Sequence, residues 1–381
     1  MKKYDVIIIG AGAAGLMSAV ELSKRKKNIL IIDMGKKLGR KIEISGGGKC
    51  NFTNTHSDYS HYFGKNPRFV CSALSQFSPQ DTLNWVKSHN IDFYEKEPGR
   101  YFCTKSSYDI INAFITDIKN TEIKFDTKLS DIIKTDNIFT LKTNNGNFLC
   151  KSVIIATGGM SYSHLGASET GYTIAKKFGH KIEPVRPGLC AIKTKSFSPD
   201  LSGISLMVEI NINKHKIKDN LLFTHFGIGG PAIYRASLLD CKQMHINFAP
   251  NINVFEFLKS AKQTNGKKSV ANILSKILPN KLAHFLCKET KNIADYKDAE
   301  LQQIANKITK FEITDGSAIG MQSAEVTYGG ISTEQISSKT MESLICPGLF
   351  FAGEVLDITG DLGGYNLQWA FSSGYIAGNN A

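Results

Sequence analysis

Residues 4–33 constrain the fold most strongly, because they have the pattern of a strand, a glycine-rich turn, a helix and a second strand. Residues 5–9 form a short apolar run of the kind that a strand buried on both faces needs. The run leads directly into Gly10, Gly12 and Gly15 of a GxGxxG pattern. These glycines are typical of a tight turn, a close backbone approach to a pyrophosphate and a helix packed closely on its strand.

The second apolar run, residues 29–32, ends at Asp33. An acid at this point is placed to accept hydrogen bonds from the hydroxyls of an adenosine ribose. The pattern alone does not distinguish NAD from FAD. The predicted contacts of this unit are Gly10, Gly12, Ala13, Ala14, Gly15, Asp33 and Met34.

Length and charge limit the remaining possibilities. A chain of 381 residues exceeds one core of typical size, so we expect two or three domains. Lysine and arginine outnumber aspartate and glutamate by 46 to 34, and a net charge of +12 favours anionic partners. Nearly all of these cations are lysine, and an A/T-rich genome would give part of the same excess without any function.

The cysteines and the apolar runs bear on the compartment. The eight cysteines include no CxxC pair, which argues for reduced thiols in a cytosolic protein and against a disulfide reductase. No stretch approaches the roughly 20 apolar residues of a membrane span. We therefore expect a cytoplasmic protein that does not bind a membrane, with no metal site.

A second glycine-rich stretch follows the first unit. Arg40 and Lys41 come first, then Ser45, three glycines at residues 46–48, Lys49, Cys50 and Asn51. Backbone amides of such a loop can crowd a flat or anionic ligand, and Arg40 offers a fork for a phosphate.

These segments resemble the flavoprotein family called HI0933-like or aminoacetone-oxidase-like, within the glutathione-reductase group of FAD proteins. The family pattern is GRK followed by SGGGRCNxTN, and Lys49 stands where the family usually has arginine. The resemblance continues through residues 153–159 and residues 349–370, and it implies FAD as the cofactor. The helix opening at residues 364–366 would direct its positive end at flavin N1 and O2. The further implied FAD contacts are Arg40, Lys41, Ser45, Gly46, Gly47, Gly48, Cys50, Asn51, Ala156, Thr157, Gly158, Gly353, Glu354, Asp361, Gly364, Tyr365, Asn366 and Leu367.

The remaining patterns predict elements and domains. We expect helices at residues 81–89 and 108–118, and a meander from strands 123–125, 138–141 and 148–150. A hairpin of strands 203–212 and 215–223 turns at residues 213–214. Strands 243–248, 311–313 and 321–328 should share its sheet. Residues 224–231 are interpreted as a turn before a proline-initiated helix, and His225 as a packed core histidine.

The predicted fold is α/β. A Rossmann-like FAD-binding domain of glutathione-reductase type is built from residues 1–188 and 325–381. A β-barrel-like insert domain covers residues 189–250 and 311–324, and it carries a basic helical module at residues 251–310. Eleven lysines against five acids give this module +6. Its candidate RNA-binding residues are Lys267, Lys268, Lys276, Lys281, Lys288 and Lys291, and a solvated lysine-rich surface is the alternative.

Two classes of function remain open. The resemblance implies a flavoenzyme that reduces a uridine of large-subunit (23S) ribosomal RNA to dihydrouridine, with Cys50 as a candidate proton donor or, equally, a small buried thiol. NAD(P)H would reduce the flavin transiently, because the chain has one dinucleotide fingerprint. The alternative is a small-molecule flavoenzyme, either an aminoacetone-type amine oxidase or a reductase of a conjugated C=C bond. A third hypothesis is a flavoprotein whose inserts bind protein partners, and the oligomeric state is undecided.

Overall fold

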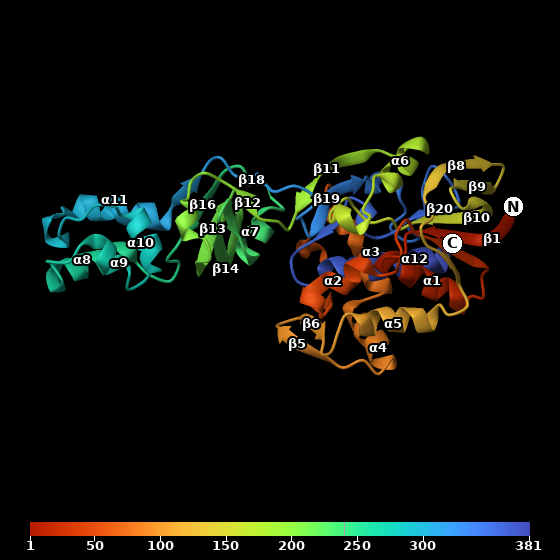
Figure 1. Ribbon diagram of the computed structural model, residues 1–381, viewed down its shortest axis with the longest axis horizontal. Helices are drawn as coiled ribbons and strands as arrows, with labels where there is room; N and C mark the ends of the chain where they lie inside the picture. The colour runs from red at the N-terminus through yellow and green to blue at the C-terminus, as the bar shows by residue number, and fades with distance from the viewer. Residues whose placement is uncertain (240) are drawn as a thin grey trace. The chain divides into compact units, whose positions relative to one another are not determined.

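The computed structural model describes residues 1–239 and 241–381, which form two compact units. Unit 1 contains residues 1–186 and 325–381, and unit 2 contains residues 187–324. Both ends of the chain therefore belong to unit 1 (Figure 1). None of the described helices is long and apolar enough to cross a membrane.

Unit 1 is built on a seven-stranded sheet. Its strand order is β7-β2-β1-β10-β9-β8, and β20 also pairs with β10. Pairing is parallel from β7 through β10 and on to β20, and antiparallel among β8, β9 and β10. The strands are β1 (Lys2–Ile9), β2 (Ile29–Ile32), β7 (Glu122–Lys124), β8 (Leu129–Thr135), β9 (Ile138–Thr143), β10 (Gly146–Ile155) and β20 (Leu349–Phe351).

The predicted meander is wrong in its first strand. Glu122–Lys124 pairs in parallel with β2 and so extends the parallel part of the sheet. The meander begins instead with Leu129–Thr135, which pairs antiparallel with β9. Alternation along the chain identifies a strand but carries no information about its partner, which explains the error.

Helix α1 (Ala13–Lys24), near the N-terminus, packs against helix α12 (Tyr365–Asn380), near the C-terminus. A Cβ on Gly374 would lie 2.4 Å from the Ala14 carbonyl oxygen, so the helix backbones approach more closely than side chains would allow. The Ser18 hydroxyl donates to the Gly374 carbonyl at 2.9 Å. This packing holds the N-terminus of α1 and the last helix in one unit.

The other elements of unit 1 flank this framework. Residues 81–89 and 108–118 are helical as predicted, in α4 and α5. Three smaller sheets have the orders β3-β6-β5, β11-β19 and β21-β4. The elements are α2 (Arg40–Gly48), β3 (Asn51–Asn54), β4 (Tyr62–Phe63), α3 (Val70–Gln76), α4 (Pro79–Ser88), β5 (Phe93–Glu97), β6 (Arg100–Cys103), α5 (Tyr108–Asp117), α6 (Thr170–Lys177), β11 (Ile182–Gly188), β19 (Val326–Ile331) and β21 (Thr359–Gly360).

Unit 2 contains a seven-stranded sheet in which every described pairing is antiparallel. Its order is β17-β16-β13-β14-β15-β12-β18. The predicted hairpin is confirmed as β13 and β14, with Asn213 in the turn at a φ of 51°. The strands are β12 (Ile192–Lys193), β13 (Ser205–Ile212), β14 (His215–Thr224), β15 (Gly227–Gly229), β16 (Met244–Asn247), β17 (Phe311–Ile313) and β18 (Ser317–Ala318).

Two predictions about unit 2 are wrong. Residues 321–328 do not return to this sheet, because the strand that includes residues 326–328 is β19, which pairs with β11. His225 is exposed rather than packed in the core, and its ring meets Phe226 edge to face. The proline-initiated helix is confirmed as α7 (Pro231–Ala236).

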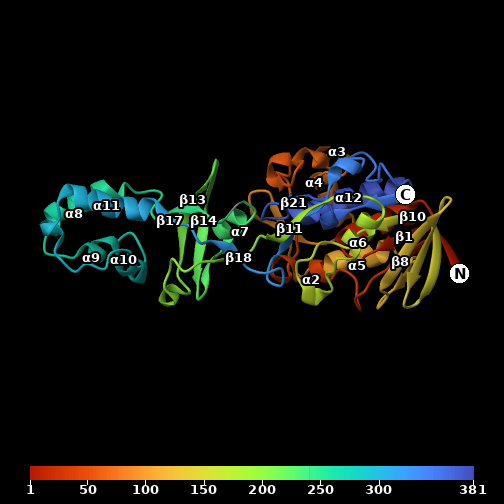
Figure 2. The ribbon, with the colours of Figure 1, turned by 90° about the horizontal axis from the view of Figure 1, so that it is seen from above.

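Residues 251–310 are largely helical, as their pattern predicts. Figures 1 and 2 show α8 beside α11 and α9 beside α10. Leu258 of α8 and Ile308 of α11 belong to the same buried cluster as Ile210 of the sheet. The helices are α8 (Val254–Thr264), α9 (Val270–Leu274), α10 (Asn280–Leu286) and α11 (Asp298–Thr309).

Candidate flavin site

The glycines of the first turn divide into two kinds. Gly10 has a φ of 112°, and a Cβ there would lie 2.3 Å from the Ala156 carbonyl oxygen. A Cβ on Gly15 would lie 2.0 Å from the Gly10 carbonyl oxygen. A Cβ on Gly12 would meet no atom of the described residues within 4 Å. Gly10 and Gly15 are therefore required by the fold, whereas Gly12 borders open space.

That open space lies at the N-terminus of α1. Gly12 is the N-cap, and the first turn contains no acidic residue and no side-chain cap from the described residues. The first backbone N–H groups of a helix lack partners within the helix, and they favour an anion. The space beside Gly12, which a side chain would occupy, is therefore suited to the pyrophosphate that the sequence predicts.

Asp33 is held firmly at the end of β2. Its carboxylate accepts hydrogen bonds from the backbone N–H groups of Ala11 and Gly35, both at 2.7 Å. The Arg40 guanidinium lies 3.1 Å from the same carboxylate. Arg40 thus orients the predicted ribose acid through one Nη2 contact, and its role toward a phosphate stays a prediction. A carboxylate has about four acceptor positions, so Asp33 can still accept from a ribose.

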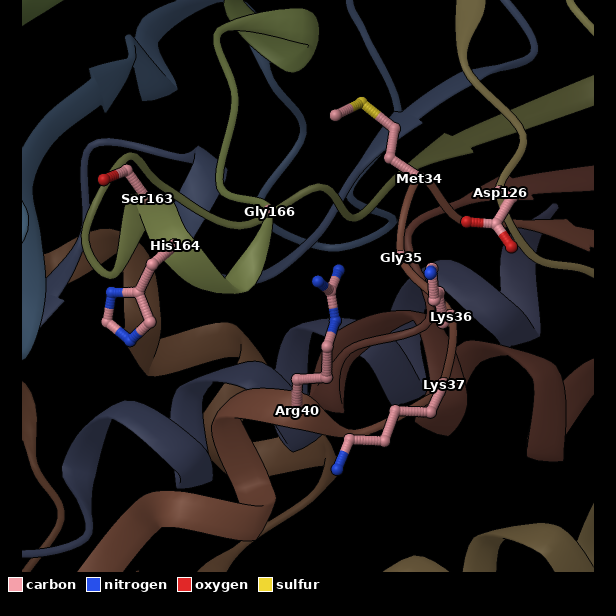
Figure 3. A pocket seen from close by; sticks show the side chains of 9 residues that line it. All are labelled: Met34, Gly35, Lys36, Lys37, Arg40, Asp126, Ser163, His164 and Gly166. Atoms are coloured by element: carbon pink, nitrogen blue, oxygen red, sulfur yellow. The ribbon is translucent and has the colours of Figure 1, made fainter.

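A cavity of about 510 Å³ opens beside Asp33. Figure 3 shows the Arg40 guanidinium directed into it, with His164 on one side and Met34 and Asp126 on the other. Of its lining, the sequence predicted only Met34 and Arg40. The others come from loops and a short 3-10 helix that the fold brings together: Gly35, Lys36, Lys37, Asp126, Ser163, His164 and Gly166.

The second glycine-rich stretch breaks the end of α2. Gly46, Gly47 and Gly48 have φ values of 57°, 66° and 83°, which L side chains rarely adopt. A Cβ on Gly47 or Gly48 would meet no described atom within 4 Å, so backbone amides border open space here as well. The Lys49 ammonium instead donates to the carbonyls of Thr104 and Lys105, both at 2.7 Å. Lys49 therefore ties the loop to the end of β6.

Cys50 lies inside the protein. Its side chain is 0% exposed, and burial raises the pKa of the thiol to about 12. A thiol that holds its proton this firmly, with no exposed surface, is poorly suited to protonating a substrate. The structure favours the packing role that the sequence left open, and a catalytic role for Cys50 stays a prediction.

Glu354 connects four segments around the site. The Lys41 ammonium lies 2.8 Å from its carboxylate, and the backbone N–H of Thr327 donates to it at 2.7 Å. The Ser161 hydroxyl and the Gly159 N–H donate to it as well. Burial opposes ionisation of Glu354, but Lys41 and the backbone donors outweigh it and hold the pKa of this carboxyl below its usual range.

The segments predicted to share one cofactor do meet in unit 1. Ala156 lies against Gly10, and a Cβ on Gly353 would lie 2.8 Å from the Ala14 Cβ. At the end of β10, Gly158 has a φ of 70° and lies beside the Glu354 carboxylate. Thr157 follows Ala156 in the same strand-to-loop connection.

The N-terminus of α12 forms the last part of the site. Gly364 caps it with a φ of 96°, and a Cβ there would lie 2.5 Å from the Thr53 carbonyl oxygen. The Asn366 amide is occupied by Gly360, accepting from its N–H at 2.8 Å and donating to its carbonyl at 2.9 Å. Asn366 thus shapes the loop before the helix.

Three further predicted contacts lie around this helix N-terminus. The ring of Tyr365 stacks on His61 at 4.6 Å, a neighbour that the sequence did not indicate. Asp361 accepts from the N–H of Leu362 at 2.7 Å, and Leu367 packs against the core of unit 1.

Comparisons with known proteins agree with this architecture. The model of the HI0933-like protein Rossmann domain matches residues 4–380. A protein of Haemophilus influenzae named ribosomal RNA dihydrouridine synthase is 41% identical, and the alignment covers 98% of both chains. An Escherichia coli protein of the same name is 36% identical over 98% of this chain and 97% of that one. A 3-dehydro-bile acid delta(4,6)-reductase of Clostridium scindens is 27% identical over 98% of both.

The predicted family and fold class are confirmed, because the family model spans almost the whole chain and the sheet is of Rossmann type. The chain therefore belongs to the HI0933-like family of FAD-dependent oxidoreductases.

Proposed function

We propose that the protein reduces a uridine of large-subunit (23S) ribosomal RNA to dihydrouridine, with FAD as its cofactor and NAD(P)H as the transient reductant. The observation that carries this proposal is the pair of relatives named ribosomal RNA dihydrouridine synthase, at 41% and 36% identity over nearly full length. Such an enzyme acts where ribosomal RNA is found, so we expect it in the cytoplasm.

The residues of unit 1 have distinct roles in this proposal. The N-terminus of α1 at Gly12 would hold the pyrophosphate, and Asp33 would accept from the ribose. The N-terminus of α12, opening after Gly364, would place the positive end of its dipole at the flavin ring. Bound FAD would supply hydride transfer to the C5=C6 bond of the uracil.

The target base must leave the stack before it can reach a flavin. The protein must hold the RNA while the base is unstacked. Lys267, Lys268, Lys276, Lys281 and Lys288 are exposed, and none forms an ion pair with a residue that the structure describes. Lys291 differs, because its ammonium lies 3.0 Å from the Glu300 carboxylate and 3.8 Å from the centre of the Tyr296 ring. Five free cations are thus available for phosphates, and Lys291 is already engaged.

Mass spectrometry of large-subunit ribosomal RNA from cells with and without the gene tests the function. We expect one uridine that is heavier by two hydrogens to disappear with the gene and to return when the purified holoprotein and NAD(P)H are added. Unmodified RNA in both strains would contradict the proposal.

A small-molecule substrate is the second candidate, and the relative named 3-dehydro-bile acid delta(4,6)-reductase supports it. Reduction of a conjugated C=C bond is chemically close to reduction of the uracil ring, so the same site would serve. Such an enzyme has no use for free lysines. If the substrate is a small molecule, replacing Lys267, Lys268 and Lys276 by alanine should leave turnover unchanged. If the substrate is RNA, the same replacement should weaken RNA binding. The slope of log affinity against log salt concentration should then fall by about 2 for single-stranded RNA.

A further inference from the structure

The hairpin of β5 and β6 carries an exposed aromatic surface. β5 is the edge strand of the sheet β3-β6-β5. Tyr94 on this strand is 41% exposed, and its ring stacks on that of Phe102, with the ring centroids 5.9 Å apart and an interplanar angle of 24°. Phe102 is buried, so Tyr94 covers it and presents its own ring to solvent.

This surface adjoins the candidate flavin site. A Cβ on Gly46 would lie 3.0 Å from the Phe102 ring, so Phe102 touches the glycine-rich loop. Phe102 also pairs with Asn51 across β3 and β6, and Asn51 is a predicted cofactor contact. One buried ring therefore separates the exposed Tyr94 from the loop that is expected to contact the flavin.

A cation lies on the same face of the hairpin. Lys96 is exposed and lies two positions after Tyr94, at a bulge where the pairing with β6 shifts between Glu95 and Glu97. Strand alternation does not place its side chain there, and its position beside Tyr94 follows from their shared neighbour Phe102. Its ammonium lies 5.6 Å from the centre of the Phe102 ring. Glu95 points to the other side, where its carboxylate accepts from the Gly99 N–H at 2.6 Å. The face that carries Tyr94 thus combines an open aromatic ring with an exposed ammonium.

We propose that Tyr94 and Lys96 bind a nucleotide next to the target uridine, with its base stacked on Tyr94 and its phosphate at Lys96. This inference rests on the proposed function. When the target base leaves the stack, its neighbour loses a stacking partner, and an aromatic ring beside a cation replaces that partner for any base. The partner is therefore single-stranded ribosomal RNA rather than a duplex.

Four variants of the holoprotein test the surface: Tyr94→Ala, Tyr94→Phe, Lys96→Ala and, as the control, Leu344→Ala. Leu344 is a matched exposed position in unit 1, with 64% of its side chain exposed. The assay measures dihydrouridine formed in ribosomal RNA from a strain that lacks the gene. Flavin content and reduction of the flavin by NAD(P)H are measured in parallel.

We expect Tyr94→Ala to raise KM for the RNA about 5- to 150-fold, which corresponds to the loss of one base stack. Tyr94→Phe keeps the ring and should resemble the wild type. Flavin content and flavin reduction should not change in either variant. Lys96→Ala should reduce the slope of log affinity against log salt concentration by about 0.7, whereas Tyr94→Ala should leave that slope unchanged.

A wild-type KM in Tyr94→Ala would overturn the inference, and so would a defect in Tyr94→Phe equal to that in Tyr94→Ala. A wild-type protein that makes no dihydrouridine would refute the proposed function instead. Fluorescence anisotropy with a single-stranded RNA oligonucleotide separates these cases, because it reports the surface without turnover. Equal binding by the wild type and Tyr94→Ala in that assay would also overturn the inference.

Discussion

Substitution of Gly12 by valine separates cofactor binding from folding. Gly12 has a φ of −86° and a ψ of −172°, which is extended backbone that valine adopts readily. Its Cβ would enter open space, so the protein itself has nothing to rearrange. A side chain at this position restricts the unfolded chain and so stabilises the folded state by about 0.4–1 kcal/mol. Valine is a poorer N-cap residue than glycine, and this destabilises the folded state by a comparable amount. We expect the free energy of unfolding of the apoprotein to change by less than about 1 kcal/mol.

The cofactor should respond very differently. The valine methyl groups would occupy the space beside the first N–H groups of α1, where the pyrophosphate is expected. Each charge-assisted hydrogen bond that is lost costs about 1.5–3 kcal/mol. Losing two weakens FAD binding by at least about 100-fold, since about 1.4 kcal/mol corresponds to a factor of ten.

Thermal unfolding with and without FAD provides the assay. Tm of the wild-type apoprotein should rise with added FAD, because the cofactor binds only the folded state, while Tm of Gly12→Val should not move. Gly15→Ala is the matched control, since its Cβ would lie 2.0 Å from a backbone oxygen and should destabilise the apoprotein by about 1–3 kcal/mol. A Gly12→Val protein that purifies with one flavin per chain would refute the reasoning.

Three other substitutions test the electrostatics and the core. Burial raises the pKa of Asp357 to about 6, and an acid with a raised pKa costs stability as pH rises from about 4 to 6. Asp357→Asn should therefore be more stable than the wild type by about 2–3 kcal/mol at neutral pH and equal to it near pH 4, by urea unfolding. Lys41→Met should lower the free energy of unfolding by about 1–3 kcal/mol at neutral pH, because the charged Glu354 carboxylate then has no cation beside it. Urea unfolding at acid pH should show a smaller loss, because Glu354 is then protonated. Cys50→Ala should cost about 1–2 kcal/mol of stability and keep dihydrouridine formation; a stable, flavin-loaded Cys50→Ala that makes no product would restore Cys50 as the proton donor.

Local pattern was sufficient to predict several elements of the fold. The apolar runs of β1, β2 and β20 and the glycines at their ends identify strands that enter tight turns, because these properties act within a few residues. Partners were harder to predict. Glu122–Lys124 is a strand, but its partner β2 is distant in the sequence. Part of residues 321–328 also forms a strand, and its partner β11 is likewise distant.

Motifs within the sequence were enough to predict the family, the Rossmann-type fold and the segments that should meet at the flavin. The contacts that those residues make with one another became known only from the folded chain. Packing placed Arg40 on Asp33 and Lys41 on Glu354, buried Cys50 completely, and left Gly12 facing open space while Gly10 and Gly15 lie against backbone. Lys41 and Glu354 are far apart in the chain, and Arg40 meets the nearby Asp33 only because the loop after β2 folds back on itself. A local pattern of residues does not encode either kind of contact.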